Sequence, residues 1–96
     1  MMKKTLTPES TIVQSKTQVS CEVAGETVIL NHERGFYYSL DAVGARIWAW
    51  MQKPVGIEKL IARVLNEYDV ESAQCERDLL RLLNELLTEG LIENGP

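Results

Sequence analysis

The sequence contains few of the residues on which enzyme active sites and metal centres are usually built. It has one histidine and two cysteines among 96 residues. His32 has no partner in a Ser/His or Cys/His arrangement, and neither Cys21 nor Cys75 has a second ligand at metal-binding spacing. The six glycines are scattered singly, so the sequence shows no glycine-rich phosphate-binding loop. We therefore expect no catalytic residue, no metal and no cofactor, and the sequence favours a binding module over an enzyme.

Long apolar runs and an excess of basic residues are also missing. No stretch approaches the roughly 20 apolar residues that a membrane-spanning helix needs. Residues 7–10 are polar or proline where a signal peptide would carry its apolar segment. Acidic residues outnumber basic ones by 14 to 10, which disfavours sequence-independent binding to phosphate backbones. We expect a cytoplasmic protein that binds neither membranes nor nucleic acid.

Length and composition indicate one small domain. Of the 96 residues, 45% are hydrophobic and 25% are charged, as in ordinary globular proteins. We expect a flexible N-terminus over residues 1–10 and a single domain over residues 11–93. In the first part of the domain, apolar residues alternate with polar ones, and Gly25 and Gly35 mark turns, which predicts strands. The expected strands cover residues 11–14, 19–23, 27–31 and 36–40.

Helical periodicity begins after the last of these strands. Asp41 is a candidate N-cap, because its carboxylate can accept hydrogen bonds from first-turn amides. Pro54 and Gly56 end the first expected helix, and a second helix follows from about Ile57. The second helix carries an apolar stripe at helical spacing, formed by Leu60, Ile61, Val64, Leu65 and Tyr68.

A third and longer helix is expected from Asp69 or Ser72, either of which could cap it. Gly90 stands where a left-handed residue ends such a helix, and Leu91 is placed to contact Leu86. The last three strands form an antiparallel meander, and the three helices follow them. The sequence thus predicts an α+β fold, a three-stranded antiparallel sheet followed by three helices in a winged-helix-like arrangement.

The last expected strand is the first candidate site. It consists of Phe36, Tyr37, Tyr38, Ser39 and Leu40 and contains no lysine or proline of the kind that usually protects a sheet edge. One interpretation is structural: Phe36, Tyr38 and Leu40 face the core, and Tyr37 is an exposed aromatic without a role. The other is that the strand is an open edge and accepts an extended peptide by β-augmentation.

The third helix offers a second candidate surface. Arg77 and Arg81 lie four residues apart and therefore on one face, with Asn84 next along it and with Asp78 and Leu80 on adjacent faces. This face is either a solvated polar surface or a wall at which the two arginines hold acidic groups of a docked peptide. As a DNA-recognition helix it would carry five acidic residues against two arginines, which disfavours binding in a major groove.

Several stretches of the sequence resemble the PqqD-like family. They are VILN at 28–31, GFYYSLD at 35–41 and VGARIW at 43–48, followed by residues 57–61, 68–70, 78–79, 83–86 and 90–92. The similarity covers roughly residues 18–93, and the order and spacing of the pieces are more specific than any one of them. One departure is the segment 52–56, QKPVG, where members that act in pyrroloquinoline quinone biosynthesis usually have an Asp-Gly turn. The stretch 35–41 looks more like discrete recognition proteins of lasso-peptide or other peptide-modifying gene clusters.

The resemblance implies a RiPP recognition element, a domain that binds the leader of a ribosomally made, post-translationally modified precursor peptide. The leader would add as a strand beside residues 36–40 and lie against the third-helix face that bears Arg77, Asp78, Leu80, Arg81 and Asn84. The implied partners are the precursor peptide and a modifying enzyme such as a leader peptidase, a cyclase or a radical SAM enzyme. The alternatives are a winged-helix DNA-binding regulator and a structural accessory subunit of a modifying enzyme. An open edge also predicts self-association into a homodimer.

Overall fold

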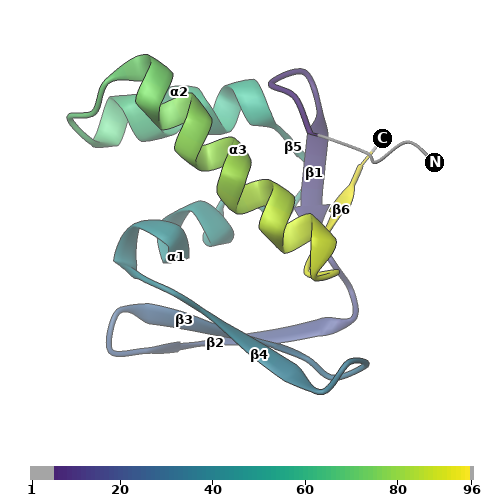
Figure 1. Ribbon diagram of the computed structural model, residues 1–96. Coiled ribbons are helices and arrows are strands. Elements are labelled where there is room, and N and C mark those ends of the chain that lie inside the picture. The colour runs from purple at the N-terminus through teal and green to yellow at the C-terminus, as the bar shows by residue number, and fades with distance from the viewer. Residues whose placement is uncertain (1–5, 96) are drawn as a thin grey trace.

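Residues 6–95 are described by the computed structural model, in which the strands and helices follow one another along the chain as Figure 1 shows. The α+β class is confirmed, as is the order of a three-stranded antiparallel sheet followed by three helices. The comparison with a winged helix is a loose one. The elements are β1 (Thr11–Gln14), β2 (Gln18–Val23), β3 (Glu26–Asn31), β4 (Phe36–Leu40), α1 (Ala42–Ala49), β5 (Val55–Gly56), α2 (Ile57–Glu67), α3 (Ser72–Thr88) and β6 (Ile92–Asn94).

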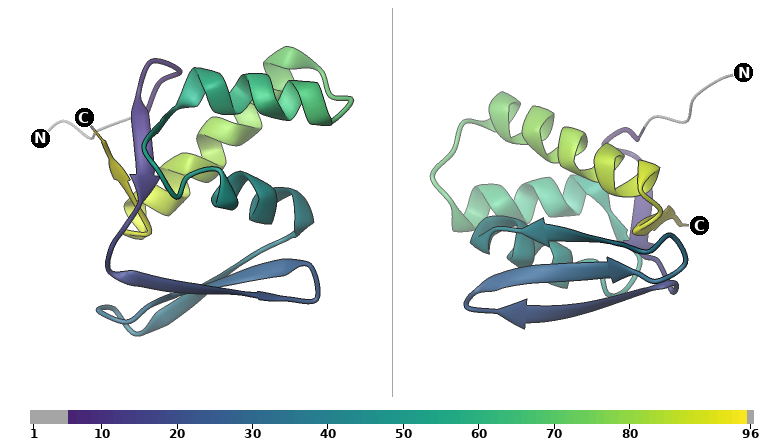
Figure 2. Two further views of the ribbon diagram at one scale, coloured as in Figure 1. Left: turned by 180° about the vertical axis from the view of Figure 1, so that it is seen from behind. Right: turned by 60° about the horizontal axis from the view of Figure 1, so that its bottom comes forward.

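The larger sheet has the strand order β2-β3-β4, so β2 and β4 are its two edges. Its first hairpin turns at Ala24 and Gly25, both of which have positive φ (53° and 84°). Two such residues make the tight hairpin turn whose twist matches that of the strands, which explains the glycine at position 25. All three helices lie on one side of this sheet, and no helix or strand within residues 6–95 covers its other face (Figure 2).

The ends of the helices follow the expected chemistry with one correction. Asp41 caps α1, and its Oδ1 accepts a hydrogen bond from the Gly44 amide at 2.8 Å. The prediction of Asp69 or Ser72 as the cap of α3 is wrong, because the Glu71 side chain accepts the hydrogen bond from the Gln74 amide instead. A glutamate reaches this amide with its longer side chain, and Ser72 becomes the first helical residue.

The C-terminal end of α3 has the geometry that its sequence predicts. Gly90 has a φ of 77°, and its amide donates to the Leu87 carbonyl. The Leu91 amide donates to the Leu86 carbonyl, and both of these leucines are fully buried. This pair of bonds is the Schellman motif, which turns the chain sharply and starts it toward β6.

A second, smaller sheet with the order β5-β1-β6 was not expected from the sequence. It joins the beginning of the domain to its end, since Ile12 pairs with Val55 on one side and with Asn94 on the other. Leu6, only 2% exposed, extends this connection, and its amide donates to Asn84 Oδ1 at 3.2 Å. Of the expected flexible N-terminus, residues 1–5 lie outside the described residues.

The core lies between the helices and the inner face of the larger sheet. Its buried members come from both sheets and all three helices, and the fully buried ones include Ile12, Ile29, Met51, Leu60, Leu83 and Leu86. The sheet contributes through alternate positions, so that the side chains of β4 point in turn toward α3 and away from it. This alternation decides which side chains of β4 face the candidate site.

Candidate functional site

Strand β4 is an open edge of the larger sheet in the described part of the chain. Its residues pair with β3 on one side only, from Asn31 with Phe36 to Thr27 with Leu40. Leu40 is buried, Phe36 and Tyr38 are half-buried against the core, and Tyr37 is 69% exposed on the uncovered face. The expected burial of Phe36, Tyr38 and Leu40 and the expected exposure of Tyr37 are confirmed, and no described strand pairs with the outer side of β4.

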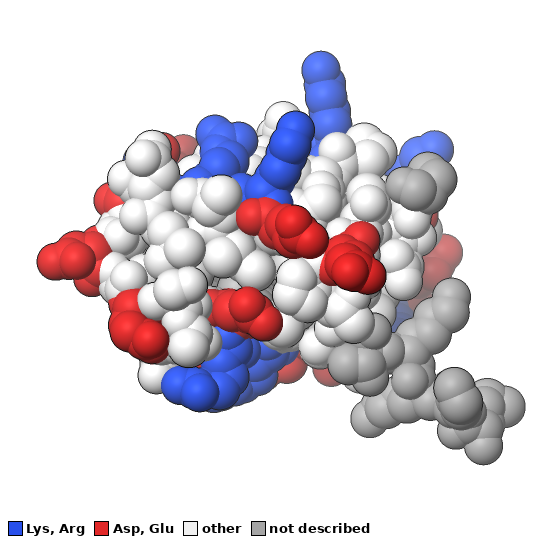
Figure 3. Space-filling view, turned by 90° about the horizontal axis from the view of Figure 1, so that it is seen from above, with Lys and Arg blue, Asp and Glu red and all other residues white. Residues whose placement is uncertain are grey.

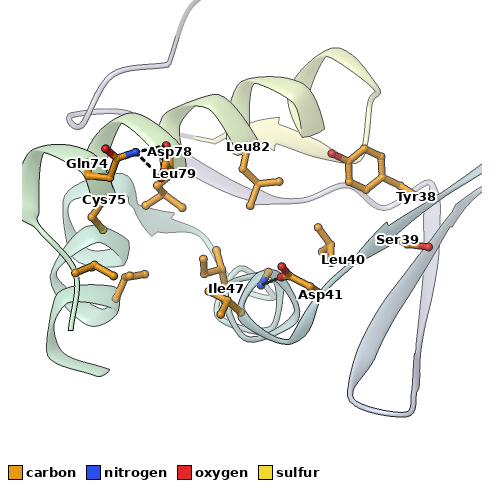
Figure 4. Close-up of a pocket in the computed structure, with 14 residues that line it drawn as sticks. Tyr38, Ser39, Leu40, Asp41, Ile47, Gln74, Cys75, Asp78, Leu79 and Leu82 are labelled. Atoms are coloured by element: carbon orange, nitrogen blue, oxygen red, sulfur yellow. Dashed lines mark hydrogen bonds between the residues drawn. The ribbon is translucent and has the colours of Figure 1, made fainter. Parts of the chain in front are cut away.

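A cavity of about 490 Å³ lies between β4 and helix α3, and residues of α1 contribute to its lining (Figure 4). Helix α3 passes over the face of the larger sheet that carries the helices (Figure 2). The side chains of Leu79 and Leu82 point from α3 toward Leu40 and Ile47 on the opposite wall (Figure 4). The lining residues are Tyr38, Ser39, Leu40, Asp41, Val43, Gly44, Ile47, Val64, Val70, Gln74, Cys75, Asp78, Leu79 and Leu82. Most of these are apolar, and Tyr38, Ser39 and Leu40 among them belong to the edge strand β4.

The two walls are joined at one point by a hydrogen bond from the Tyr38 hydroxyl to Glu85 Oε1. Burial of the phenol raises the pKa of Tyr38 to about 12, and the hydrogen bond and charge of Glu85 and the charge of Glu89 act in the same direction. Tyr38 therefore stays neutral over the physiological range and keeps the bond between β4 and α3.

The raised pKa of Tyr38 predicts a loss of stability in strong alkali. Because the neutral phenol is favoured in the folded state, its contribution is complete below the ordinary pKa of 10 and is lost as the pH rises toward 12. The measurement is the ultraviolet absorbance of tyrosinate in the wild type and in Tyr38→Phe. The difference between the two titrations should show a step near pH 12, and a step near pH 10 would contradict the structure.

The third-helix residues expected at the site do not all line this cavity. Asp78 lines the cavity, whereas Arg77, Leu80, Arg81 and Asn84 are not among its lining residues. Arg77 donates to the Gln74 side chain, and Arg81 Nη2 lies 3.6 Å from Asp78 Oδ1 at the rim. The Asn84 side chain accepts a hydrogen bond from the Leu6 amide through Oδ1 and donates one to the Leu80 carbonyl through Nδ2.

The face of α3 that borders the cavity is instead the line of Gln74, Asp78 and Leu82, with Glu85 one turn further on. Sequence reasoning missed Leu82 as a site residue because a leucine on this helix is expected to face the core. Leu82 is half-buried, packs against the core and also lines the cavity. The sequence did contain a signal for Leu82, because it follows Asp78 by four residues and therefore lies on the same face of the helix. Val43 and Val70, both exposed and lining the cavity, carried no such signal.

The charged side chains on one face of the molecule, and the potential metal ligands within the described residues, bear on two other kinds of site, a nucleic-acid interface and a metal centre. On the face that lies uppermost in Figure 1, acidic and basic side chains are interspersed, with no continuous basic patch (Figure 3). Within residues 6–95, no group of three or more histidine, cysteine, aspartate or glutamate side chains could hold a metal ion. No helix in the same range combines the length and apolar character that a membrane crossing requires.

Together these features define a small α+β binding domain with a free sheet edge beside an apolar cavity. A family model described as coenzyme PQQ synthesis protein D (PqqD) matches residues 26–92. The chain belongs to the PqqD family, which confirms the resemblance seen in its sequence.

One solved structure shares both the fold and part of the sequence. It is described as TbiB1 in complex with the TbiA(beta) leader peptide and is similar to this chain at a TM-score of 0.80 and 33% identity. The similarity covers 88% of this chain and 98% of that one. A comparison with curated proteins gave no match.

Proposed function

We propose that this chain binds the leader segment of a ribosomally made precursor peptide as an added strand beside β4. The observation that carries the proposal is the position of β4, a free edge that faces α3 across an apolar cavity. A structure 33% identical to this chain and matching 98% of its own length holds a leader peptide, which supports the same ligand class here. The chain acts without catalysis, as a binding module of the RiPP recognition type.

Strand addition divides affinity and specificity between two parts of the site. The free backbone amides and carbonyls of β4 bind any extended chain, and the cavity selects among side chains. The bridge from Tyr38 to Glu85 and the buried Leu40 hold both walls in place before the peptide arrives. Because the groove is already formed before binding, only the peptide loses conformational entropy, and the entropic cost of binding is smaller.

The bound peptide would then be presented to a modifying enzyme in the cytoplasm, such as a leader peptidase, a cyclase or a radical SAM enzyme. The peptide-contacting residues we propose are those of β4 together with Asp78 and Leu82 on α3. The sequence also predicts contacts from Arg77, Leu80, Arg81 and Asn84. These residues do not line the cavity, so we do not include them among the contacts proposed here, and their part in binding stays a prediction of the sequence. Pairing of β4 with β4 of a second copy would use the same edge, so the peptide should dissociate any homodimer.

The direct test is a titration of this chain with the leader of a precursor encoded beside its gene. Binding with a 1:1 stoichiometry, and none to a random DNA duplex, supports the proposal. A gene neighbourhood with no short precursor reading frame, or a precursor that does not bind, counts against it. Copurification of the modifying enzyme with this chain in the absence of any precursor binding would indicate an accessory subunit instead.

Replacing the exposed aromatic of the edge strand should weaken this binding. Tyr37→Lys removes contact surface and adds a charge at the edge where the leader lies, and we expect a Kd about five- to tenfold higher. The matched control is Val19→Lys, since Val19 is 59% exposed on the same sheet face but on the opposite edge strand. Equal Kd values for the two variants in a fluorescence anisotropy titration would place the site elsewhere.

A further inference from the structure

The charged side chains that line the cavity are all acidic. Asp41 contributes a carboxylate where β4 ends, and Asp78 contributes one from α3 on the opposite wall (Figure 4). No lysine, arginine or histidine of residues 6–95 is among the lining residues. The walls between the two carboxylates are apolar, including Ile47, Leu79 and Leu82. Both carboxylates are partly exposed to water, so their charges act mainly at short range, on a group that enters the cavity.

The neighbours of these carboxylates do little to neutralise them. Gln74 Nε2 donates to both oxygens of Asp78 at 3.0 Å, but an amide carries no charge. Arg81 lies 3.6 Å from Asp78, and with side chains 71% and 53% exposed this ion pair is a weak one. Asp41 Oδ1 binds a backbone amide, that of Gly44. The cavity therefore keeps a negative charge that no buried cation compensates in the described part of the chain.

Two further carboxylates, Glu85 and Glu89, lie toward the C-terminal end of α3, where they line a second hollow together with Arg81. Glu85 binds the Tyr38 hydroxyl, and Glu89 lies close enough for its charge to act on Tyr38. The cation nearest to Glu89 in the described residues is Arg34, at 4.0 Å and with its side chain 57% exposed. A ligand that lies along β4 thus meets carboxylates at the cavity and again at the Tyr38 end.

We propose that the groove selects peptides in which a lysine or arginine lies two positions from an apolar residue. This inference rests on the proposed strand addition at β4. Alternate side chains of an extended strand point to the same side, so an apolar residue enters the cavity while the basic residue reaches Asp78 and Asp41. The aliphatic stem of the basic side chain covers the apolar walls. Acidic peptides are rejected by like charge.

The test is a selection from a random-peptide display library on the intact chain. Enriched peptides are synthesised with a fluorescent label, and their contact with β4 is checked by amide NMR shifts of residues 36–40. We expect enrichment of an apolar residue and a lysine or arginine two positions apart, in either order. Replacing that basic residue by alanine should raise the Kd about five- to tenfold, and the loss should shrink between about 50 mM and 500 mM salt.

Variants of the protein test the same inference by changing the carboxylates of the cavity and not the peptide. Asp78→Asn keeps the shape of the side chain, and Asp41→Asn keeps an N-cap residue, so both should fold and both should weaken the selected peptide severalfold. Glu76→Gln removes an equal charge from α3 away from the cavity and should leave the Kd unchanged. Peptides that shift β4 amides without a basic preference, or an effect of Asp78→Asn no larger than that of Glu76→Gln, would overturn the inference alone. A library with no peptide that shifts β4 amides would overturn the proposed function as well.

Discussion

Leader binding is expected to fall at least tenfold when Leu82 is replaced by arginine. Leu82 points from α3 into the cavity, and an arginine there would fill the space that a peptide side chain needs. It would also follow Asp78 by four residues, the spacing and order in which an acid and a base pair well on a helix. The new side chain would thus occupy the groove and neutralise one of its carboxylates. The measurement is the Kd by fluorescence anisotropy.

The chain supplies a matched control for this variant. Leu80 is also a half-buried leucine of α3, but it is not among the cavity-lining residues. Leu80→Arg should therefore cost a similar amount of stability, about 1–2 kcal/mol, with little change in Kd. A thermal melt of both variants shows whether each is folded at the temperature of the titration. If Leu80→Arg lost binding and Leu82→Arg kept it, the peptide would lie on the other face of α3.

The largest effect on stability is expected from Leu83→Ala. Leu83 is fully buried in α3, next along the chain to Leu82 but turned into the core. Truncating a buried leucine loses apolar burial and leaves a cavity, which destabilises proteins by about 2–5 kcal/mol. In a domain of this size that corresponds to a Tm lower by roughly 10 °C or more. Chemical denaturation gives the free energy of unfolding directly.

A half-buried leucine on the same helix provides a reference for the stability loss expected from Leu83→Ala. Leu87→Ala removes the same atoms from a position that is only partly buried, and we expect a loss of about 1 kcal/mol. A loss below 1 kcal/mol for Leu83→Ala, or equal losses for the two variants, would mean that α3 packs differently. Correct packing of this helix matters for function because α3 forms one wall of the groove.

The sequence was sufficient at most positions where local chemistry decides the structure, although the cap of α3 is Glu71 and neither Asp69 nor Ser72. The alternation at 36–40 placed Tyr37 outside and Leu40 inside, and Asp41 was a cap because its carboxylate reaches a first-turn amide. Gly90 ended α3 because a left-handed residue was needed there. The open edge of β4 could be anticipated from the absence of protecting residues, although its position at the edge depends on the strand order that the fold sets.

Features that depend on contacts between residues far apart in sequence could not be predicted from local patterns. The smaller sheet is built partly from strands of two and three residues, too short for any periodicity, and it exists because β1 lies between segments far apart in sequence. The side of α3 that faces the cavity depends on the rotation of the helix about its own axis, which is set by its packing against the core. The pattern alone suggested the face of Arg77 and Arg81, and the cavity lies on the neighbouring face of Asp78 and Leu82.

Hydrogen–deuterium exchange with and without the leader peptide tests the central claim most directly. A strand added beside β4 would give hydrogen-bond partners to edge amides within Phe36–Leu40, and exchange there should slow at least tenfold at saturation. The opposite edge, β2 (Gln18–Val23), is the internal control and should exchange as before. Unchanged exchange over Phe36–Leu40 in a saturated complex, or new protection confined to Gln18–Val23, would contradict the account.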